Sequence, residues 1–288
     1  MIWVRGEVVP DEAPAISVLD RAFEHGLGLF ETLRTWDGRP TLLQRHLGRL
    51  RRSARELGIP FDEGDLPDEA AVRSLLGEGG SLDDRTLRIT LSGGFDDGRP
   101  GRIWMRSRPL PPPPGRPGAR ACATWFPAED DRLLRSKALN YWSRRLAFEE
   151  ARGLGYDENL SRLGSGAILE GSRTNVFLVE GGRLVSPDDH GEDGRPRPML
   201  PGIMRSVVLE RAAAMGLSVD PGTLVTLDDF RRADECFLTN AVRGIIPVVQ
   251  LGPLGTGLAE PICYIHPGPV TRRLMDDLHA WLRSEDAR

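Results

Sequence analysis

The sequence predicts an α+β protein with two lobes, and three observations support this. The chain has 288 residues, enough to build two cores. Helical and strand patterns mix without a regular βαβ alternation, which argues against a doubly wound parallel sheet. Prolines dominate residues 109–118. Because consecutive prolines neither continue a helix nor donate to a sheet, this stretch predicts a stiff linker between a lobe at 1–108 and a larger one at 119–288.

The sequence of the first lobe predicts a mixture of strands and helices. Turn signals at Asp37-Gly38 and Gly93-Gly94 end two of the strands, and Gly58 ends a helix whose apolar residues recur at helical spacing. The expected elements are strands at 2–4, 29–35 and 41–43, helices at 44–57 and 68–76, and a strand at 86–92.

The second lobe predicts a meander of short strands with glycine turns, together with three helices. The helix at 202–215 is expected to be amphipathic. The expected elements are a strand at 120–125, a helix at 141–153, strands at 159–163, 167–170 and 175–179, the helix at 202–215, strands at 235–239 and 245–249, and a closing helix at 270–282.

Composition narrows the function classes. The net charge of −4 and the pI of about 5.8 argue against a nucleic-acid or anionic-membrane partner, and no apolar run is long enough to span a bilayer. The N-terminus does not resemble a signal peptide. Three widely separated cysteines fit reduced thiols, so we expect a cytoplasmic protein. The histidines show no metal-ligand spacing, and we expect no metal.

Lys137 is the only lysine of the chain, although lysine and arginine together number 38. Arginine replaces a surface lysine well, but it stays protonated and cannot act as a neutral nucleophile. A buried lysine can lose its proton and attack a carbonyl to form a Schiff base. From the count alone, a compositional accident explains the single lysine equally well. Tyr141 follows within one turn and favours the chemical interpretation, because a carbonyl cofactor with a ring oxygen needs a hydrogen-bond donor.

Glu170 ends a predicted strand, and Asn175 begins the next after a turn of small residues. A carboxylate fixed there would hold a protonated heterocyclic nitrogen, as an electron-withdrawing cofactor requires. Taken alone, the segment also fits a hairpin with an exposed Glu and a turn-forming Asn.

Two segments are candidates for binding a phosphate. The helix start at 200–205, with Gly202, offers free N–H groups and a positive dipole end, although any Pro-Gly helix start looks similar. The break at 239–241 lies between two strands and offers further N–H groups. Arg49 lies on an arginine-rich helix, where a solvated surface role is the simpler interpretation for that residue alone.

Seven ordered segments together resemble the class IV pyridoxal-phosphate (PLP) aminotransferases, which include branched-chain aminotransferases, D-amino acid aminotransferases and 4-amino-4-deoxychorismate lyases. The resemblance runs nearly end to end. The segments are GLGLFETLRTWDG (26–38), HLGRL (46–50), KALNY (137–141), LEGSRTNVF (169–177), LPGIMR (200–205), LTNAVRGIIPV (238–248) and GPVTRRL (268–274).

The resemblance implies the fold-type IV architecture, with a small α/β N-terminal lobe, a larger C-terminal lobe on a barrel-like sheet, and a site between them completed by a second subunit of a homodimer. It implies that Lys137 forms the Schiff base with PLP and shuttles the substrate proton, that Glu170 holds the pyridine nitrogen, and that Tyr141 donates to the ring oxygen. The implied phosphate ligands are Arg49 and the amides of Ile203, Met204 and Ala241, and the implied substrate contacts are Phe30, Thr32, Asn240 and Arg243.

Within the family, the segments look most like the lyases, which release p-aminobenzoate and pyruvate. The pattern at 92–95 offers neither Arg nor His where D-amino acid enzymes carry both, and His25 and Ala241 replace residues typical of branched-chain enzymes. The alternative is an aminotransferase that moves an amino group between a branched-chain or related amino acid and a 2-oxo acid. A non-catalytic homologue is disfavoured because Lys137 and Glu170 are both present. The stretch 188–198 is longer than usual, and its role is open.

Overall fold

The computed structural model describes residues 1–77, 83–112, 115–191, 194–220 and 224–284. Residues 113–114 of the expected linker and 192–193 of the long stretch at 188–198 therefore lie outside the described part. The chain forms two compact units. The first contains Met1–Pro112, Ser136–Tyr141 and the segment from Trp281 onward, and the second contains Pro113–Arg135 and Trp142–Ala280.

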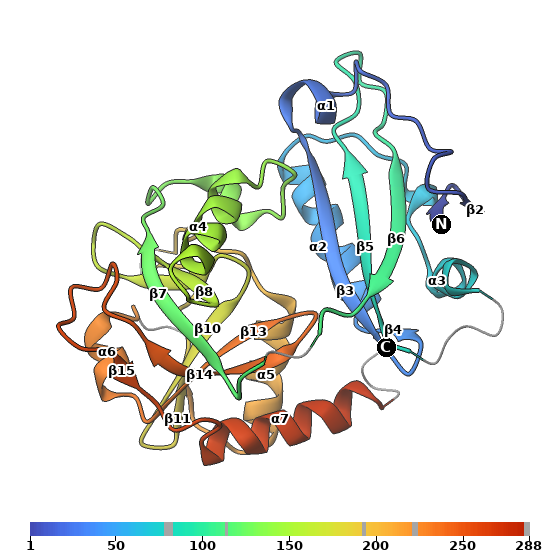
Figure 1. Ribbon diagram of the computed structural model, residues 1–288. Helices are drawn as coiled ribbons and strands as arrows, with labels where there is room; N and C mark the ends of the chain where they lie inside the picture. Colours follow the sequence, from blue (N-terminus) through green and yellow to red (C-terminus); the bar gives the residue numbers. More distant parts are fainter. Residues whose placement is uncertain (78–82, 113–114, 192–193, 221–223, 285–288) are drawn as a thin grey trace. The chain divides into compact units, whose positions relative to one another are not determined.

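The first unit is built on an antiparallel six-stranded sheet in the order β2-β1-β6-β5-β3-β4 (Figure 1). Side chains alternate between its two faces. The strands are β1 (Ile2–Val4), β2 (Glu7–Val9), β3 (Gly28–Trp36), β4 (Arg39–Pro40), β5 (Arg85–Ser92) and β6 (Ile103–Pro109).

Helices cover one face of this sheet. Leu29, Leu33, Leu87 and Ile89 of the strands pack with α2 (Leu43–Glu56) and α3 (Glu69–Leu76) in one core. Asp68 caps α3 by accepting a hydrogen bond from the Ala71 N–H. The remaining short helices of the unit are α1 (Arg21–His25), capped by Asp20, and the 3-10 helix η1 (Glu63–Asp65).

The second unit is built on a nine-stranded sheet, six strands of which close into a barrel. The ring runs β7-β8-β9-β10-β13-β14 and returns to β7, and the pairing of Asn175 with Glu170 joins β10 to β9. The strands are β7 (Ala119–Trp125), β8 (Glu158–Arg162), β9 (Ile168–Gly171), β10 (Asn175–Glu180), β11 (Arg183–Val185), β12 (Val219–Asp220), β13 (Glu235–Asn240), β14 (Gly244–Leu251) and β15 (Ile262–Cys263). The expected barrel-like sheet is therefore confirmed.

Small and branched apolar side chains such as Ala121, Ala123, Val176 and Leu238 fill the main core of this unit. Its helices are η2 (Arg132–Arg135), α4 (Trp142–Gly153), α5 (Ile203–Ala214), α6 (Leu227–Arg232) and α7 (Pro269–Leu282), whose last two residues count with the first unit. None of the helices in the described residues is both long and apolar enough to cross a membrane.

Most expected elements are present, and the differences have physical causes. The strand expected at 41–43 is wrong: β4 ends at Pro40, and Leu42 adopts a left-handed conformation that starts α2 at Leu43. Strand β6 was not expected, because its arginines and Trp104 look like surface residues and prolines follow at once. Residues 136–141 were assigned to the second lobe by sequence, but they belong to the first unit.

Candidate functional site

The segment that carries Lys137 is held against β3 by backbone hydrogen bonds. The Phe30 N–H donates to the Lys137 carbonyl at 2.9 Å, and the Leu139 N–H donates to the Gly28 carbonyl at 2.9 Å. Gly28 has a φ of 144°, and a Cβ there would lie 2.6 Å from the Leu91 carbonyl oxygen. Glycine is therefore required where the segment docks.

Two aromatic rings border the Lys137 amine. Its Nζ lies 4.7 Å from the Phe30 ring centroid and 5.7 Å from that of Tyr141. The two rings meet edge to face at 5.3 Å. Lys137 is half-buried, so its amine stands at the edge of an aromatic environment. Phe30 and Tyr141, both expected near the site from sequence, thus lie beside Lys137.

Arg88 shares the Phe30 ring with Lys137 and was not identified from sequence. Its guanidinium carbon lies 3.7 Å from the ring centroid, and Thr32 is its cross-strand partner on β3. Burial, with the nearby charge of Arg106, lowers the pKa of Arg88 to about 10, so it remains cationic at neutral pH. The signal that sequence offered was an arginine in the middle of a half-buried strand.

Arg49 is buried in an ionic cluster with Glu31 and His46. Its Nε donates to Glu31 Oε1 at 2.8 Å and its Nη2 to Oε2 at 2.7 Å, while His46 Nδ1 lies 2.7 Å from Oε2. All three residues are at most 5% exposed. Arg49 is therefore not a solvated surface arginine, and two of its nitrogens are bound before any ligand is considered.

The charges of this cluster are set by its geometry. Burial raises the pKa of a carboxyl, but the charge and hydrogen bonds of Arg49, with the hydrogen bond from His46, outweigh burial and hold the pKa of Glu31 at about 2. Burial lowers the pKa of His46, opposed by Glu31 and reinforced by Arg49 and Lys137. His46 is therefore neutral at pH 7, and its Nδ1–H donates to the ionised Glu31.

In the second unit, Glu170 is buried and held at both oxygens. Arg144 Nη2 donates to Oε1 at 2.6 Å, and the Leu200 N–H donates to Oε2 at 3.2 Å. Arg144 also donates to the Leu134 carbonyl at 2.8 Å. Glu170 is 2% exposed and Arg144 is 5% exposed, so the exposed-Glu interpretation of this hairpin is wrong. Arg144 escaped the sequence analysis, although it lies three residues before Ala147 on the buried face of α4.

A second buried carboxylate organises the turn between β9 and β10. Glu158 Oε1 accepts from the Asn159 N–H and from the N–H and hydroxyl of Ser172, and Oε2 accepts from Thr174. These bonds hold the turn that joins Glu170 to Asn175. Sequence reasoning missed Glu158, because a glutamate at the start of a strand gives no sign that small polar residues satisfy it.

The start of α5 presents backbone donors. Gly202 is its N-cap and makes no side-chain capping bond, and the N–H groups of Ile203 and Met204 meet no acceptor among the described residues. Asn175 packs so closely against Gly202 that a Cβ would overlap its Oδ1, and Asn175 Nδ2 donates to the Leu200 carbonyl at 3.2 Å. A helix start of this kind suits an anion.

The turn from β13 to β14 is shaped by Asn240. Its Oδ1 accepts from the Val242 N–H at 3.0 Å and the Arg243 N–H at 2.8 Å. Within the described chain the Ala241 N–H has no acceptor.

The site residues predicted from the sequence form two groups, one in each unit. Phe30, Thr32, Arg49, Lys137 and Tyr141 belong to the first unit, and Glu170, Ile203, Met204, Asn240, Ala241 and Arg243 belong to the second.

The described part of the long stretch at 188–198 is held by local bonds. His190 Nδ1 lies 3.2 Å from Asp189 Oδ1, and Arg197 donates to the Asp188 carbonyl at 3.3 Å. Arg205 at the start of α5 donates to the Pro187 carbonyl at 2.5 Å. The Arg205 bond joins the segment after β11 to the first turn of α5.

The barrel, the single lysine and the buried glutamate are features of an enzyme that works through a lysine-bound carbonyl cofactor. The family model described as Amino-transferase class IV matches residues 28–251, so the chain belongs to this family. Members of this family are PLP-dependent enzymes, and this chain is one of them.

Individual relatives include both lyases and aminotransferases. The chain is 32% identical to a 4-amino-4-deoxychorismate lyase from Pseudomonas aeruginosa, with a TM-score of 0.78 and coverage of 99% of this chain and 100% of that one. It is 25% identical to the branched-chain amino acid aminotransferase from Escherichia coli, with a TM-score of 0.82 and coverage of 100% and 95%. It is 26% identical to the aminodeoxychorismate lyase of Bacillus subtilis, over 89% of this chain and 88% of the relative.

Proposed function

We propose that the protein is a PLP-dependent 4-amino-4-deoxychorismate lyase that releases p-aminobenzoate and pyruvate, with Lys137 as its catalytic residue. The observation that carries the lysine assignment is the position of the chain's only lysine amine beside the rings of Phe30 and Tyr141. Arginine cannot replace this amine, because it does not deprotonate in proteins.

The donors and acceptors described above fit PLP. In the first unit, Lys137 would bind the aldehyde carbon, Tyr141 would donate to the ring oxygen, and Arg49, already oriented by Glu31, would contribute to phosphate binding. In the second unit, Glu170 would accept from the protonated ring nitrogen. The N–H groups of Ile203, Met204 and Ala241 would bind phosphate oxygens. The Glu170 carboxylate would contact the positively charged ring nitrogen, and the N–H groups would contact the negatively charged phosphate. Each charged group of PLP would therefore have a complementary partner.

When bound, PLP withdraws the electrons of a bond broken at the substrate α-carbon. The residues of the chain supply binding and proton transfer. Lys137 in its neutral form would accept the α-proton and later return a proton. Glu170, held by Arg144, would accept a hydrogen bond from the protonated ring nitrogen. Phe30, Thr32, Asn240 and Arg243 would contact the substrate, and Arg88 offers a carboxylate-binding guanidinium on the same ring as Lys137.

Two considerations support the lyase over the alternative. The 32% identity to the Pseudomonas aeruginosa lyase extends over essentially both chains. In addition, His25 and Ala241 depart from the branched-chain pattern. The alternative is an aminotransferase acting on a branched-chain or related amino acid and a 2-oxo acid. Arg88 favours that alternative, since an amino-group acceptor such as 2-oxoglutarate carries two carboxylates.

The test is to incubate the holoenzyme with aminodeoxychorismate and, separately, with leucine and 2-oxoglutarate. We expect p-aminobenzoate and pyruvate in equal amounts from the first mixture. Glutamate from the second mixture, without p-aminobenzoate from the first, would establish the alternative. Lys137→Arg is the matched control, because it keeps the charge and removes the nucleophile.

We also propose a homodimer and a cytoplasmic location. Support for the homodimer comes from the first unit, where Val18, Leu19 and Phe23 are each more than 60% exposed. Apolar side chains that cluster on a surface mark an interface more often than a solvated face. The three cysteines are free, as expected for a reducing compartment. Sedimentation of the holoenzyme tests the dimer, with Phe23→Ser expected to weaken it.

A further inference from the structure

Arg144 holds two acceptors with a single nitrogen. Its Nη2 donates to Glu170 Oε1 at 2.6 Å and to the Leu134 carbonyl at 2.8 Å. This nitrogen carries two hydrogens, so each acceptor can receive one of them. Arg144 and both acceptors belong to the second unit. The guanidinium group therefore links η2 to β9, and it does so from α4.

The surroundings of Arg144 hold its side chain in this position. Trp125, Leu134 and Ala147 form a cluster of buried apolar residues, and the Arg144 guanidinium carbon lies 5.4 Å from the Trp125 ring centroid. Asn159 ties the same part of α4 to β7, because its Nδ2 donates to the Ala147 carbonyl at 2.9 Å and its Oδ1 accepts from the Trp125 N–H at 3.2 Å. A side chain locked by packing and by hydrogen bonds is suited to orient the groups that it contacts.

Leu134 and Arg144 lie on either side of the segment that carries the reactive amine. The backbone leaves the second unit to form Ser136–Tyr141 in the first unit, and then returns to the second unit as α4. Lys137 lies three residues after Leu134 and seven residues before Arg144. The bond from Arg144 to the Leu134 carbonyl therefore closes the base of this excursion, while the backbone bonds to β3 hold its middle.

The two acceptors of Arg144 relate to two different groups of the proposed site. Glu170 is assigned to the ring nitrogen of PLP, and Lys137 is assigned to its aldehyde carbon, on the opposite side of the ring. Arg144 bonds directly to the first of these residues and to the backbone that leads into the second. Reacting groups must be held within a fraction of an ångström of their productive geometry, so such a shared support matters for both.

We propose that Arg144 is a positioning residue that orients Glu170 and, through the Leu134 carbonyl, sets the position of Lys137 for its bond to PLP. This inference rests on the proposed function, because it takes Lys137 as the residue that bonds to the cofactor. Arg144 acts through the groups that it holds and takes no part in proton transfer.

The experiment is equilibrium titration of the apoprotein with PLP and with pyridoxine 5′-phosphate. The second compound has the same ring and phosphate, but an alcohol replaces the aldehyde, so it cannot bond to Lys137. Glu170 contributes to both affinities, whereas only the PLP affinity depends on Lys137. We expect the unmodified protein to prefer PLP, and Arg144→Met to reduce this preference about tenfold, as the loss of one hydrogen bond to a charged donor predicts.

Two further variants separate the two bonds of Arg144. The double variant Arg144→Met, Glu170→Gln has no carboxylate left at this place, so it gives a more stable protein in which the same loss of preference is expected. Glu170→Gln alone keeps the bond to Leu134. We expect Glu170→Gln to bind both compounds more weakly and to retain the preference for PLP.

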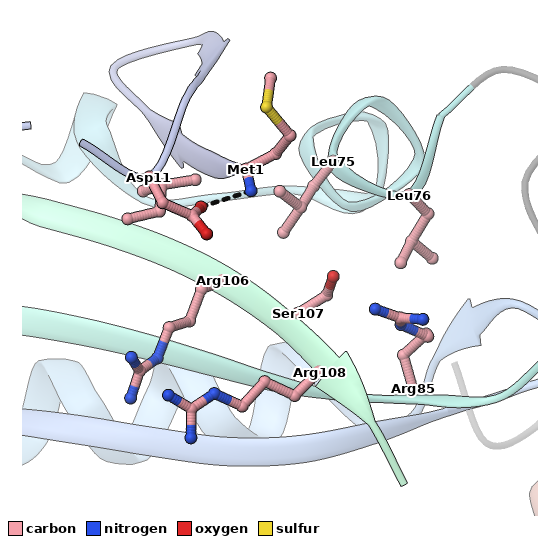
Figure 2. Close-up of a pocket in the computed structure, with 9 residues that line it drawn as sticks. Met1, Asp11, Leu75, Leu76, Arg85, Arg106, Ser107 and Arg108 are labelled. Atoms are coloured by element: carbon pink, nitrogen blue, oxygen red, sulfur yellow. Dashed lines mark ion pairs between the residues drawn. The ribbon is translucent and has the colours of Figure 1, made fainter. Parts of the chain in front are cut away.

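Two controls make the same change elsewhere. Arg145→Met replaces an exposed arginine on α4 that pairs with Glu149. Arg108→Met replaces an exposed arginine of β6 that lines the pocket shown in Figure 2. Both variants are expected to bind PLP and pyridoxine 5′-phosphate as the unmodified protein does.

An unchanged preference for PLP in Arg144→Met and in the double variant would overturn the inference. An equal loss of preference in Glu170→Gln would also overturn it, because the effect would then pass through Glu170 and not through Leu134.

The same titration with Lys137→Ala distinguishes this inference from the proposed function. If Lys137→Ala keeps the full preference for PLP, another residue bonds to the cofactor and the proposed function fails. A reduced preference in Arg144→Met, in a protein whose unmodified form makes no p-aminobenzoate from aminodeoxychorismate, would support the role of Arg144 and contradict the proposed reaction alone.

Discussion

Arg144 and Glu170 form a buried ion pair, with Nη2 and Oε1 2.6 Å apart and side chains that are 6% and 2% exposed. Glu170 lies on β9 beside the strand pairing that closes the barrel, and Arg144 lies on the buried face of α4. The pair therefore joins the helix to the barrel and orients the carboxylate proposed to bind the cofactor nitrogen.

Replacing Arg144 by Met is expected to destabilise the protein by about 3–5 kcal/mol, because it leaves the Glu170 charge buried without its cation. Urea denaturation measures this loss. The double variant Arg144→Met, Glu170→Gln is expected to recover part of it. Arg145→Met is the matched control on the same helix, since Arg145 pairs with Glu149 at the surface and is 60% exposed. Equal stabilities of Arg144→Met and Arg145→Met would contradict the prediction.

Lys137→Ala and Lys137→Arg are both expected to abolish turnover while leaving the fold intact. The side chain is half-buried and contributes little to the core, so thermal unfolding is expected to change little. Borohydride reduction of the holoenzyme, followed by peptide mass mapping, is expected to place the cofactor on Lys137 alone. Activity in Lys137→Arg, or a tag on the Met1 amino group instead of Lys137, would place the chemistry elsewhere.

Glu31 makes the free energy of unfolding depend on pH in the acid range. Its pKa is about 2 in the folded protein against an ordinary value of 4.5, so its contribution is fully present above pH 4.5 and is lost as the pH falls toward 2. The depression corresponds to about 3 kcal/mol. The stability difference between the unmodified protein and Glu31→Gln, from urea denaturation, is expected to shrink across this range. A difference that stays constant between pH 5 and pH 2.5 would show that the cluster does not hold the charge.

His46 also makes the stability of the fold decrease as the pH falls, but in a higher pH range than Glu31. Burial lowers its pKa in the folded protein, so the unfolded chain binds the additional proton first, and stability falls as the pH drops below the ordinary value of 6.5. His46→Gln keeps a hydrogen-bond donor for Glu31 but does not titrate. We expect urea denaturation to show a weaker loss of stability for this variant between pH 7 and pH 5 than for the unmodified protein. An identical loss would assign it to other groups.

The sequence predicted the elements whose pattern is local, but not the contacts that depend on burial. Helix α2 was expected from its apolar spacing, yet the same spacing places His46 and Arg49 three residues apart on its inner face, where Glu31 meets them. From sequence alone, an arginine at any position of a helix fits the solvated surface. Only the packed structure therefore identifies Arg49 and Arg144 as buried.

Residues 136–141 illustrate a second limit. The sequence predicts that they lead into a helix starting at Tyr141, and the helix begins at Trp142. Nothing in their pattern indicates that Lys137 and Leu139 bond to β3, more than a hundred residues earlier. The resemblance implied a cofactor contact for Tyr141 and a substrate contact for Phe30, but no periodicity indicates that both rings border the Lys137 amine.

Gly202→Ala is expected to weaken cofactor binding, because the added Cβ would overlap the Asn175 amide and displace the start of α5. The N–H groups of Ile203 and Met204 would then lose their common direction toward a phosphate. Adding Asn175→Ala to the variant removes the overlap and is expected to restore part of the PLP affinity, measured by equilibrium titration of the apoprotein. Gly153→Ala, which meets open space at the end of α4, is the control and is expected to bind PLP normally. Normal affinity in Gly202→Ala would mean that the phosphate is bound elsewhere.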